Sequence, residues 1–207
     1  MSGPSPSLTC RPAGRDGLLV ELHDPADVMP LYAEIHRRKP DGIIEVVPAA
    51  RTVLIAGPGA AALARELPHW TLTPDAQVES REIEVPVIYD GTDLQSVATA
   101  TGLTTAQVIE LHSQADYRVA FCGFAPGFAY LSGLPQALHL PRRDTPRTAV
   151  PAGSVAIAGT YSGVYPRALP GGWQLLGRTD LALWNAARQP PALLLPGTRV
   201  RFVPRTG

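Results

Sequence analysis

Hydrophobic positions in the first part of the chain follow two different periods. Residues 18–22 (LLVEL) form a short apolar run that predicts a strand. Apolar residues then recur every three or four positions, as on one face of an α-helix; they are Val28, Leu31, Tyr32 and Ile35. Asp24 and Pro25 supply an N-cap and a first-turn proline for this helix, which should end before Pro40.

The next apolar runs predict two strands and a second helix. Residues 43–49 and 51–57 are typical of strands joined by a turn, and residues 61–70 of a helix. The order βαββα is typical of an α+β fold, with an antiparallel sheet and both helices on one face. Residues 81–89 (REIEVPVIY) form another strand, which either closes this unit or leaves it.

A polar stretch that contains a proline divides the chain. It runs from Leu72 to Ser80 and predicts a linker. We therefore expect two domains, a small α+β domain over residues 1–80 and a second domain over residues 81–207.

Two short helices and a series of short strands are expected in the second domain. Residues 93–102 and 104–114 are predicted helices, and Thr104 with Gln107 forms a capping box at the start of the second. Beyond residue 115 the helical period disappears, and glycine- and proline-rich loops separate short apolar runs. These strand candidates are residues 117–124, 154–159, 174–177, 181–185 and 198–204. Such a series is typical of a closed or nearly closed β-barrel, so this domain should be mainly β.

Composition and charge narrow the possible functions. Of the 207 residues, 45% are hydrophobic and 17% charged, an ordinary globular balance. The formal net charge is zero, so the field that would attract nucleic acid or an anionic membrane is missing. No apolar run approaches a bilayer span and the first 15 residues show no export signal, so we expect a cytoplasmic protein without nucleic-acid or membrane partners.

Cysteine and lysine usage excludes several kinds of chemistry. Cys10 is expected in a frayed N-terminal arm and Cys122 in an apolar strand, which argues against a structural disulfide. Cys122 is either a nucleophile or a buried apolar residue, and the second is favoured because no base is identifiable beside it. Lys39, the only lysine, lies at a helix end and fits neither a Walker A loop nor a biotin attachment site.

Residues 121–179 combine glycine, proline, arginine and aromatic residues without a helical or strand period. Glycine and proline together encode shaped loops, and long loops in a compact domain are usually disordered or functional. The aromatic residues argue against disorder, because they supply apolar area that a packed structure would bury. We expect the functional site in this region.

Five ordered motifs in this region resemble those of one protein family. They are GFAPGFAYL (123–131), LPRRDTPR (140–147), VPAGSVAIAG (150–159), YPRALPGGW (165–173) and QLLGRT (174–179). The set resembles the family that groups the B subunit of bacterial 5-oxoprolinase, the first subunit of allophanate-hydrolase-like proteins and the sporulation kinase inhibitor KipI. Residues 18–57 and 81–113 also follow the family's looser pattern. The resemblance implies a cyclophilin-like barrel after a smaller α+β domain.

The resemblance implies two alternative functions. In the first, the chain is part of an ATP-dependent hydrolase that opens 5-oxoproline to L-glutamate, or of an allophanate-hydrolase-like complex. Its partner would be a larger carboxyltransferase-like subunit, namely the C subunit of 5-oxoprolinase or the second subunit of allophanate hydrolase. ATP with Mg²⁺ would serve the complex and, because this chain has no P-loop, would bind mainly on the partner. In the second, the chain is a binding module that inhibits a sensor histidine kinase without catalysis.

The first motif supplies a candidate pocket wall for a small polar carboxylate or amide substrate. Its two glycines let the backbone bend so that amide groups face a ligand. We expect Phe124, Pro126 and Gly127 to bind substrate on this basis. The alternative from the residues alone is a tight barrel corner plugged by the phenylalanines; the family resemblance favours the pocket wall.

The second motif supplies candidate guanidinium groups. Arginine recognises planar carboxylates and phosphates through a bidentate fork, and the neighbouring prolines limit where these side chains point. Arg142 and Arg147, which match the family's Pro-Arg positions, are expected to bind substrate. Arg143 is expected to be exposed and paired with Asp144.

The later motifs add further candidates, none of them assigned as catalytic. Ser154 lacks the Gly-x-Ser-x-Gly elbow, so a hydrogen-bonding or turn role is favoured over that of a nucleophile. Trp173, Gln174 and Arg178 offer an aromatic wall, an amide and a guanidinium. For the first two, a core tryptophan and a loop-holding amide are an equal alternative. Tyr165 is a further candidate.

Only one of the five histidines attracts a functional interpretation. His112 ends a predicted helix and matches an Ile/Leu-His-Ser element of the family. An imidazole there gains from the helix dipole when protonated, which is compatible with a functional or a structural role; the structural role is favoured. The other histidines form no metal-binding motif, so no metal site is expected.

Two departures from the family pattern bear on the substrate. Residues 159–163 read GTYSG where relatives commonly have Gly-Gln-Thr-Gly, and Leu169 replaces a serine. We expect both positions in the pocket, where losing polar groups can reject a substrate that depends on them.

Overall fold

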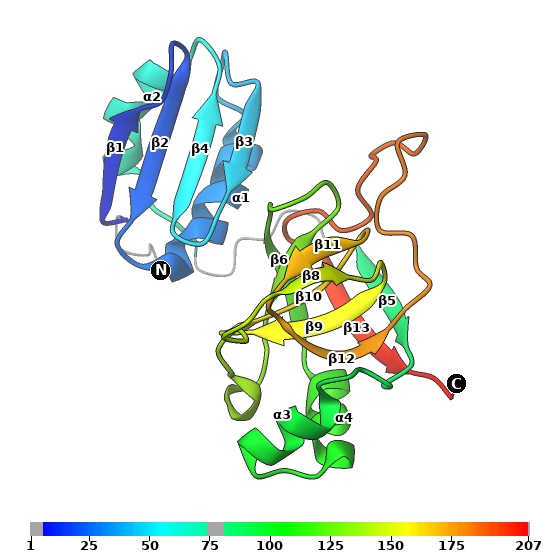
Figure 1. The fold of residues 1–207 in the computed structure, drawn as a ribbon. Coiled ribbons are helices and arrows are strands. Elements are labelled where there is room, and N and C mark those ends of the chain that lie inside the picture. Colours follow the sequence, from blue (N-terminus) through cyan, green and yellow to red (C-terminus); the bar gives the residue numbers. More distant parts are fainter. Residues whose placement is uncertain (1–5, 74–80, 207) are drawn as a thin grey trace. The chain divides into compact units, whose positions relative to one another are not determined.

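The computed structural model describes residues 6–73 and 81–206. The chain separates into two compact units, Met1–Ser80 and Arg81–Gly207 (Figure 1). Each unit has an apolar core of its own.

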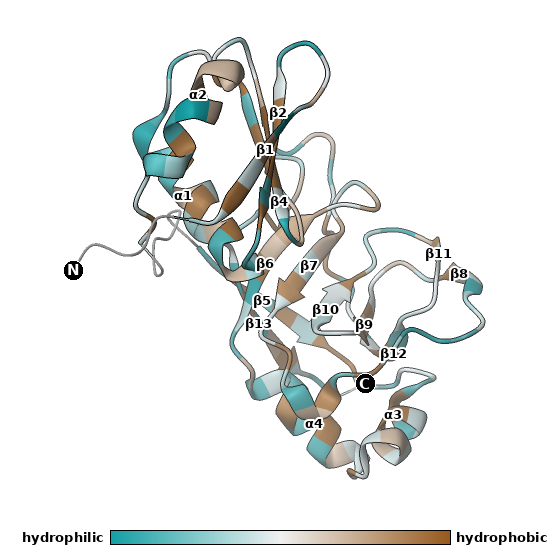
Figure 2. Ribbon diagram, turned by 90° about the vertical axis from the view of Figure 1, so that its left-hand side faces the viewer, coloured by the Kyte–Doolittle hydropathy of each residue, from teal (hydrophilic) through white to brown (hydrophobic). Residues whose placement is uncertain are grey.

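The first unit is a four-stranded antiparallel sheet with both helices on one face (Figures 1 and 2). Its elements are β1 (Leu8–Pro12), β2 (Gly17–Leu22), α1 (Val28–Arg38), β3 (Glu45–Pro48), β4 (Thr52–Ala56) and α2 (Ala60–Glu66), with 3₁₀ turns at Pro25–Asp27 and Leu67–His69. The strand order is β1-β2-β4-β3. The Asp24 carboxylate accepts a hydrogen bond from the Ala26 amide at 2.9 Å and so caps the first 3₁₀ turn, which leads directly into α1. The predicted α+β arrangement of this unit is confirmed.

The N-terminal arm differs from the prediction. Residues 8–12, expected to be frayed, form edge strand β1, in which Cys10 pairs with Val20 of β2. The sequence does not indicate this strand, because it is short and ends in a proline. With β1 included, the order of elements in this unit is ββαββα. Leu72, assigned to the linker, is buried in the core of this unit; residues 74–80 lie outside the described residues.

The second unit is a nearly closed barrel. Its helices are α3 (Leu94–Thr101) and α4 (Thr105–Gln114), with a 3₁₀ turn at Gln136–Leu138, and its strands are β5 (Glu82–Val87), β6 (Tyr117–Cys122), β7 (Ala129–Ser132), β8 (Arg147–Val150), β9 (Ser154–Ala158), β10 (Tyr161–Val164), β11 (Leu169–Gly171), β12 (Gln174–Arg178) and β13 (Arg199–Pro204). Seven strands follow the order β12-β9-β10-β7-β6-β13-β5, and only β13 and β5 are parallel. Ile88 and Arg178 exchange backbone hydrogen bonds of 2.9 Å in both directions, which joins the two ends of the sheet.

Helices α3 and α4 lie together at one end of the barrel (Figure 1). They add Val97 and Val108 to a core that contains Leu131, Ile157 and Phe202 of the barrel. The predicted capping box at the start of α4 is present, with both reciprocal hydrogen bonds between Thr104 and Gln107. The expected fold class of this unit, a mainly β barrel, is confirmed.

The predicted strand at residues 181–185 (LALWN) is wrong. This segment makes only an isolated bridge between Trp184 and Ala192. The Arg188 guanidinium donates to the carbonyl of Leu183 at 3.2 Å and to that of Pro191 at 2.8 Å. The same two carbonyls also accept hydrogen bonds from backbone amides, Leu183 from Leu193 at 2.8 Å and Pro191 from Asn185 at 3.0 Å. The backbone pairing of this segment is limited to one bridge, so the segment is a loop and not a strand.

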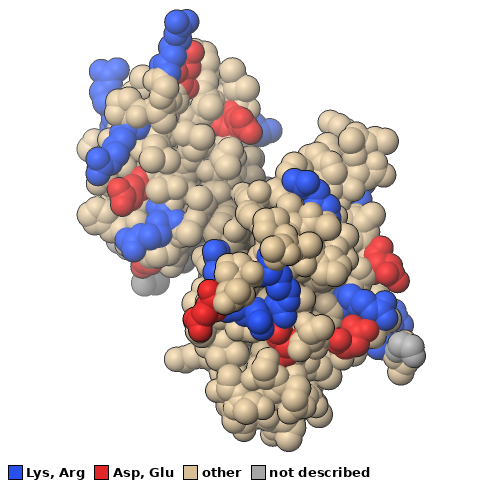
Figure 3. Space-filling view, in the orientation of Figure 1, with Lys and Arg blue, Asp and Glu red and all other residues tan. Residues whose placement is uncertain are grey.

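Charges of both signs lie in mixed groups on the face shown in Figure 3. Arg178 Nε lies 2.8 Å from Asp90 Oδ2, and both side chains are about half exposed. Exposed pairs of this kind contribute about 0–1 kcal/mol. Within the described ranges, no helix is both long and apolar enough to cross a bilayer.

Candidate functional site

A second apolar layer covers part of the outer wall of the barrel. Along β9, Val155 and Ile157 belong to the barrel core, whereas Ala156 and Ala158 pack into a separate cluster with Val150 of β8. The two-stranded ribbon of β8 and β11 contributes to this outer layer. Because both faces of β9 are covered, its residues 155–158 are continuously apolar instead of alternating.

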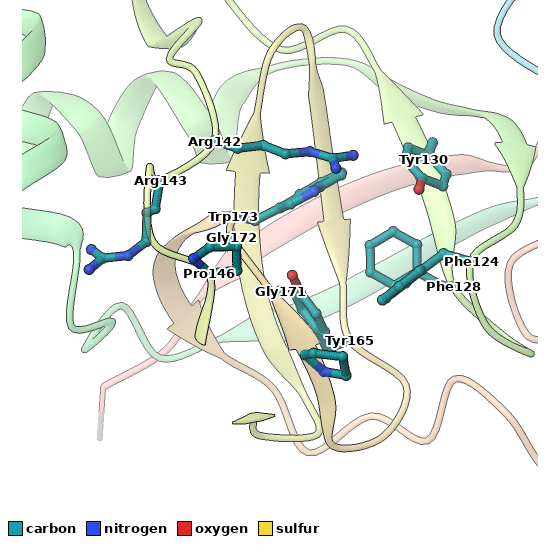
Figure 4. A pocket seen from close by; sticks show the side chains of 11 residues that line it. Phe124, Phe128, Tyr130, Arg142, Arg143, Pro146, Tyr165, Gly171, Gly172 and Trp173 are labelled. Carbon is teal, nitrogen blue, oxygen red and sulfur yellow. The ribbon is translucent and has the colours of Figure 1, made fainter. Parts of the chain in front are cut away.

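A cavity of about 240 Å³ opens in this outer layer (Figure 4). Its lining is mostly aromatic, with one proline-glycine-glycine stretch and two arginines. The lining residues are Phe124, Phe128, Tyr130, Arg142, Arg143, Pro146, Tyr165, Pro170, Gly171, Gly172 and Trp173. In Figure 4, Phe124 and Phe128 lie on one side and Trp173 with Arg142 on the other.

The two neighbouring arginines point in different directions. The Arg143 amide donates to the Gly172 carbonyl at 2.7 Å, which ties this segment to the loop before β12. Figure 4 shows the Arg142 side chain extending beside Trp173, whereas Arg143 points away. Among the described residues, Arg142 has no ion-pair partner. It therefore offers the cavity a guanidinium that is available to an anion.

Arg143 points instead to Asp93, a carboxylate that is only 3% exposed. Asp93 Oδ1 accepts from Arg143 at 2.9 Å and from Arg147 at 2.7 Å. Asp93 Oδ2 accepts from the Leu175 amide at 2.8 Å. The expected pairing of Arg143 with Asp144 is thus wrong, because Asp93 is buried within reach. One carboxylate from the start of α3 fixes both the segment that carries Arg142 and the start of β12.

The phenylalanine-rich loop between β6 and β7 is shaped by two turns. The Phe128 amide donates to the Ala125 carbonyl at 3.0 Å, with Pro126 and Gly127 between them and a φ of +81° at Gly127. Proline followed by a glycine of positive φ is the sequence of a type II turn. The Gly123 amide also donates to the Phe128 carbonyl at 3.2 Å. Three of the amides that could have faced a ligand, those of Gly123, Ala125 and Phe128, are therefore bound within the loop.

The floor of the cavity depends on contact between Tyr165 and Gly171. The Tyr165 side chain is buried, and burial raises the pKa of its hydroxyl. A β-carbon at position 171 would overlap this hydroxyl oxygen, so the position requires glycine.

Gly171→Ala should therefore lower the free energy of unfolding by about 1–3 kcal/mol, the usual cost of overpacking. Urea unfolding measures the loss. Gly172→Ala is the matched control, because a β-carbon there would meet nothing nearer than the Arg143 carbonyl oxygen at 3.4 Å. If Gly171→Ala and Gly172→Ala lose equal amounts of unfolding free energy, close contact between Tyr165 and Gly171 is not what stabilises this part of the cavity.

The structure brings some of the predicted binding residues together. Phe124, Arg142, Tyr165 and Trp173 line the cavity. The others do not line it; they are His112, Pro126, Gly127, Arg147, Ser154, Gln174 and Arg178. Pro126 and Gly127 form the type II turn behind Phe124, and Arg147 is bound to Asp93 and to the Thr92 hydroxyl.

Three of the predicted residues lie at other places on the barrel. Ser154 is buried at the start of β9. Gln174 donates to the Pro141 carbonyl at 3.2 Å and so supports the arginine segment. Arg178 is paired with Asp90 and lines a separate hollow of about 350 Å³ near the point where the barrel closes.

His112 is fully buried and joins α4 to the barrel. Its Nε2 lies 2.9 Å from the Ser162 hydroxyl and its Nδ1 2.8 Å from the Tyr89 hydroxyl. Burial lowers the pKa of the imidazole to about 3, so it is neutral at pH 7. Because neither His112 nor Ser162 is exposed, this arrangement supports the structural role.

Cys122 behaves as a largely buried thiol. Burial raises its pKa to about 11, and its Sγ donates to the Leu194 carbonyl at 3.4 Å. A thiol with a raised pKa is a poor nucleophile. The apolar interpretation of Cys122 is therefore supported.

The two departures from the family pattern lie outside the cavity lining. The Tyr161 ring packs edge-on against Phe121 and Tyr130, at centroid distances of 5.5 Å and 5.8 Å. Leu169 is buried in the outer apolar layer. The expectation that both line the pocket is wrong for this cavity, although Tyr161 supports one of its walls through Tyr130.

Sequence analysis missed Asp93, Phe128 and Tyr130 as residues of the site. Phe128 and Tyr130 lie inside a motif already singled out. They are two residues apart, and residues with this spacing lie on the same face of a strand, which could have indicated that both face the cavity. Asp93 directly precedes a helix, which is typical of a cap. The residues with described positions contain no group of three or more His, Cys, Asp or Glu that could hold a metal ion.

An α+β unit followed by a nearly closed barrel, with an aromatic cavity and a free guanidinium on the barrel's outer wall, defines the class of this protein. The sequence model of the carboxyltransferase domain, subdomain C and D, matches residues 8–194. The chain belongs to this family.

Named relatives and solved structures agree with this assignment. The chain is 50% identical over 171 residues to the B subunit of 5-oxoprolinase from Escherichia coli O157:H7, covering 79% of this chain and 78% of that protein. The crystal structure of TTHA0988 superimposes with a TM-score of 0.77 and 37% identity over 96% of this chain. This chain spans only 41% of TTHA0988. The urea amidolyase of K. lactis has the same fold over 98% of this chain and 15% of its own length, with a TM-score of 0.70 and 21% identity.

Proposed function

We propose that the chain is a subunit of an ATP-dependent hydrolase complex that opens 5-oxoproline to L-glutamate, and that it acts with a larger partner subunit. The observation that carries the proposal is the cavity, in which the guanidinium of Arg142 lies against an aromatic wall. The cavity belongs to a chain that is 50% identical over 171 residues to the B subunit of a 5-oxoprolinase. The name of this relative favours an enzyme subunit over the kinase-inhibitor alternative.

The cavity suits the two chemical parts of such a substrate. 5-Oxoproline has a carboxylate and a compact lactam ring. Arg142 would bind the carboxylate, and Trp173, Phe128 and Tyr165 would contact the ring. At about 240 Å³ the cavity is smaller than sites for drug-sized ligands, which are roughly 300–1,000 Å³, and this favours a compact ligand.

In this proposal the residues of the cavity bind and orient the substrate and do not make or break covalent bonds. Its hydroxyl groups come from Tyr130 and Tyr165, and burial raises the pKa of Tyr165, which keeps this hydroxyl protonated. Neither is placed beside a base in the cavity lining. The groups that activate the lactam and deliver water are therefore assigned to the partner.

Nucleotide binding is assigned to the partner as well. A P-loop needs a lysine after its glycines, and the single lysine of the chain, Lys39, lies instead at the end of α1 in the first unit. ATP would supply a phosphoryl group that makes the lactam carbon more electrophilic. In the proposed complex, this chain contacts the carboxylate and the ring of the substrate, and the partner binds ATP.

Replacing Arg142 by alanine tests the proposal. In a complex purified with the larger subunit, Arg142→Ala should raise KM for 5-oxoproline about 10–100-fold, because a charge-assisted hydrogen bond of roughly 1.5–3 kcal/mol is lost. Glutamate release in the presence of ATP measures the effect, and gel filtration checks that the complex still assembles.

The matched control is Arg201→Ala, since Arg201 is exposed, bound to Glu84 and absent from the cavity lining. Its KM should stay at the wild-type value. If the wild-type complex releases no glutamate from 5-oxoproline, the proposed function is wrong. If Arg142→Ala leaves KM unchanged in an active complex, only the site is wrong.

A further inference from the structure

Phe124 has a backbone conformation that phenylalanine rarely adopts. Among the described residues, Lys39 and Phe124 are the non-glycine residues with positive φ, at +48° and +69°. Lys39 ends α1 in the left-handed conformation, where a positive φ is common. Phe124 lies in the loop between β6 and β7, so no helix end accounts for its φ.

A very tight turn imposes this conformation. The Ala125 amide donates to the Gly123 carbonyl at 2.8 Å, across Phe124 alone. A three-residue turn with positive φ at its centre is the rare and strained form of the γ-turn. The adjoining type II turn and the bond from the Gly123 amide to the Phe128 carbonyl hold it in place. Phe124 therefore cannot relax without breaking the loop.

Packing does not account for the phenylalanine. Its side chain is 59% exposed, more than the other exposed large apolar residues of this unit, Trp184 at 42% and Leu195 at 37%. The ring makes an edge-on contact with Phe128, at a centroid distance of 5.5 Å, and it is Phe128 that fills the interior. Glycine would adopt the same φ without strain, yet the sequence places glycine one residue earlier, at position 123.

The exposed ring instead borders the cavity, across from Arg142 and Trp173 (Figure 4). Backbone strain that local packing does not explain is found mainly at functional sites. A ring held at the cavity mouth can cover the apolar face of a ligand whose carboxylate reaches Arg142. Covering that face would remove apolar area from water on both partners, which is favourable.

We propose that Phe124 is a specificity-determining residue whose fixed ring covers the ring of a bound cyclic carboxylate and so selects compact cyclic ligands over open-chain ones. This inference rests on the proposed function. The carboxylate contact of Arg142 is common to both kinds of ligand, whereas the Phe124 contact is available only to a ligand with an apolar ring face.

The first test measures the strain in the isolated chain. Phe124→Gly and Phe124→Ala both remove the ring, but only alanine keeps a β-carbon at positive φ. The melting temperature of the glycine variant should exceed that of the alanine variant by about 2–4 °C. Equal melting temperatures, or a lower one for glycine, would overturn the strained conformation.

The second test uses the complex with the larger subunit. Phe124→Gly should raise KM for 5-oxoproline about tenfold while kcat changes little, because the lost contact is apolar and made in the ground state. The inhibition constant of cyclopentanecarboxylate should rise by a similar factor, about tenfold, whereas that of acetate should stay within about twofold. Phe124→Tyr retains the ring and should therefore raise KM less than Phe124→Gly does.

Leu195→Ala is the control for an exposed apolar residue outside the cavity lining and should leave KM unchanged. If Phe124→Gly has the wild-type KM in an active complex, the ring does not contact the ligand and this inference is wrong while the proposed function stands. If the wild-type complex does not act on 5-oxoproline, both are wrong.

Discussion

Asp93→Ala should destabilise the second unit by about 3–5 kcal/mol, the usual cost of removing one partner from a buried ion pair. The carboxylate is 3% exposed and accepts hydrogen bonds from two guanidinium groups and from the Leu175 amide. Its removal leaves Arg143 and Arg147 close together without a counter-charge, and it leaves a buried amide without an acceptor. Urea unfolding of the purified chain measures the loss.

Two further variants sharpen this test. Asp93→Asn keeps the shape and one acceptor oxygen but removes the charge, so its loss should be smaller than that of alanine and still measurable if alanine prevents folding. Asp90→Ala is the matched control, because Asp90 is also paired with an arginine, Arg178, but is about half exposed. Its loss should be about 0–1 kcal/mol. Similar losses for Asp90→Ala and Asp93→Ala would show that the buried carboxylate does not hold the two arginines in place.

The second large effect is a decrease in the free energy of unfolding at acidic pH. His112 is neutral and buried in the folded chain, with its pKa lowered to about 3 by burial. The unfolded chain binds a proton at this residue below its ordinary pKa of about 6.5, whereas the folded chain does not until about pH 3. Protonation of His112 in the unfolded chain therefore does not lower the free energy of unfolding above about pH 6.5, and it lowers this free energy progressively as the pH falls toward 3.

The expected decrease is about 1.4 kcal/mol per pH unit, or roughly 2 kcal/mol between pH 6.5 and pH 5. Urea unfolding at a series of pH values measures it as a slope. His112→Gln, which cannot titrate, should show a slope shallower by this amount, even if the variant is less stable overall. A wild-type slope in His112→Gln would show that His112 is not buried as a neutral group.

The elements that sequence analysis predicted correctly are those with local signals. The capping box of Thr104 and Gln107 indicated the start of α4, and the spacing of Leu31 and Ile35 indicated the buried face of α1. Such signals depend on neighbours three or four residues away, so a single sequence is enough to detect them. The short ribbon strands β8 and β11 have no comparable signal, because their pairing joins segments about 20 residues apart.

The candidate site was predicted in part for the same reason. Its motifs were found because glycine, proline and aromatic residues are concentrated in them, and Arg142 and Trp173 do line one cavity. The different directions of Arg142 and Arg143 could not be predicted, because they depend on a backbone bond to Gly172 and on a carboxylate 50 residues away. Phe124 was chosen for its motif, whereas its positive φ is visible only in the folded loop.

The pairing of β5 with β13 has a consequence for how the protein forms during translation. The first and last strands of the second unit are neighbours, and β13 lies between β5 and β6. Until residues 199–204 leave the ribosome, both of those strands have an open edge that can pair with another nascent chain. The first unit can fold while synthesis continues, but the second has to wait for its last strand. A chain that ends before this point would leave β5 and β6 without the strand between them and would be prone to aggregation.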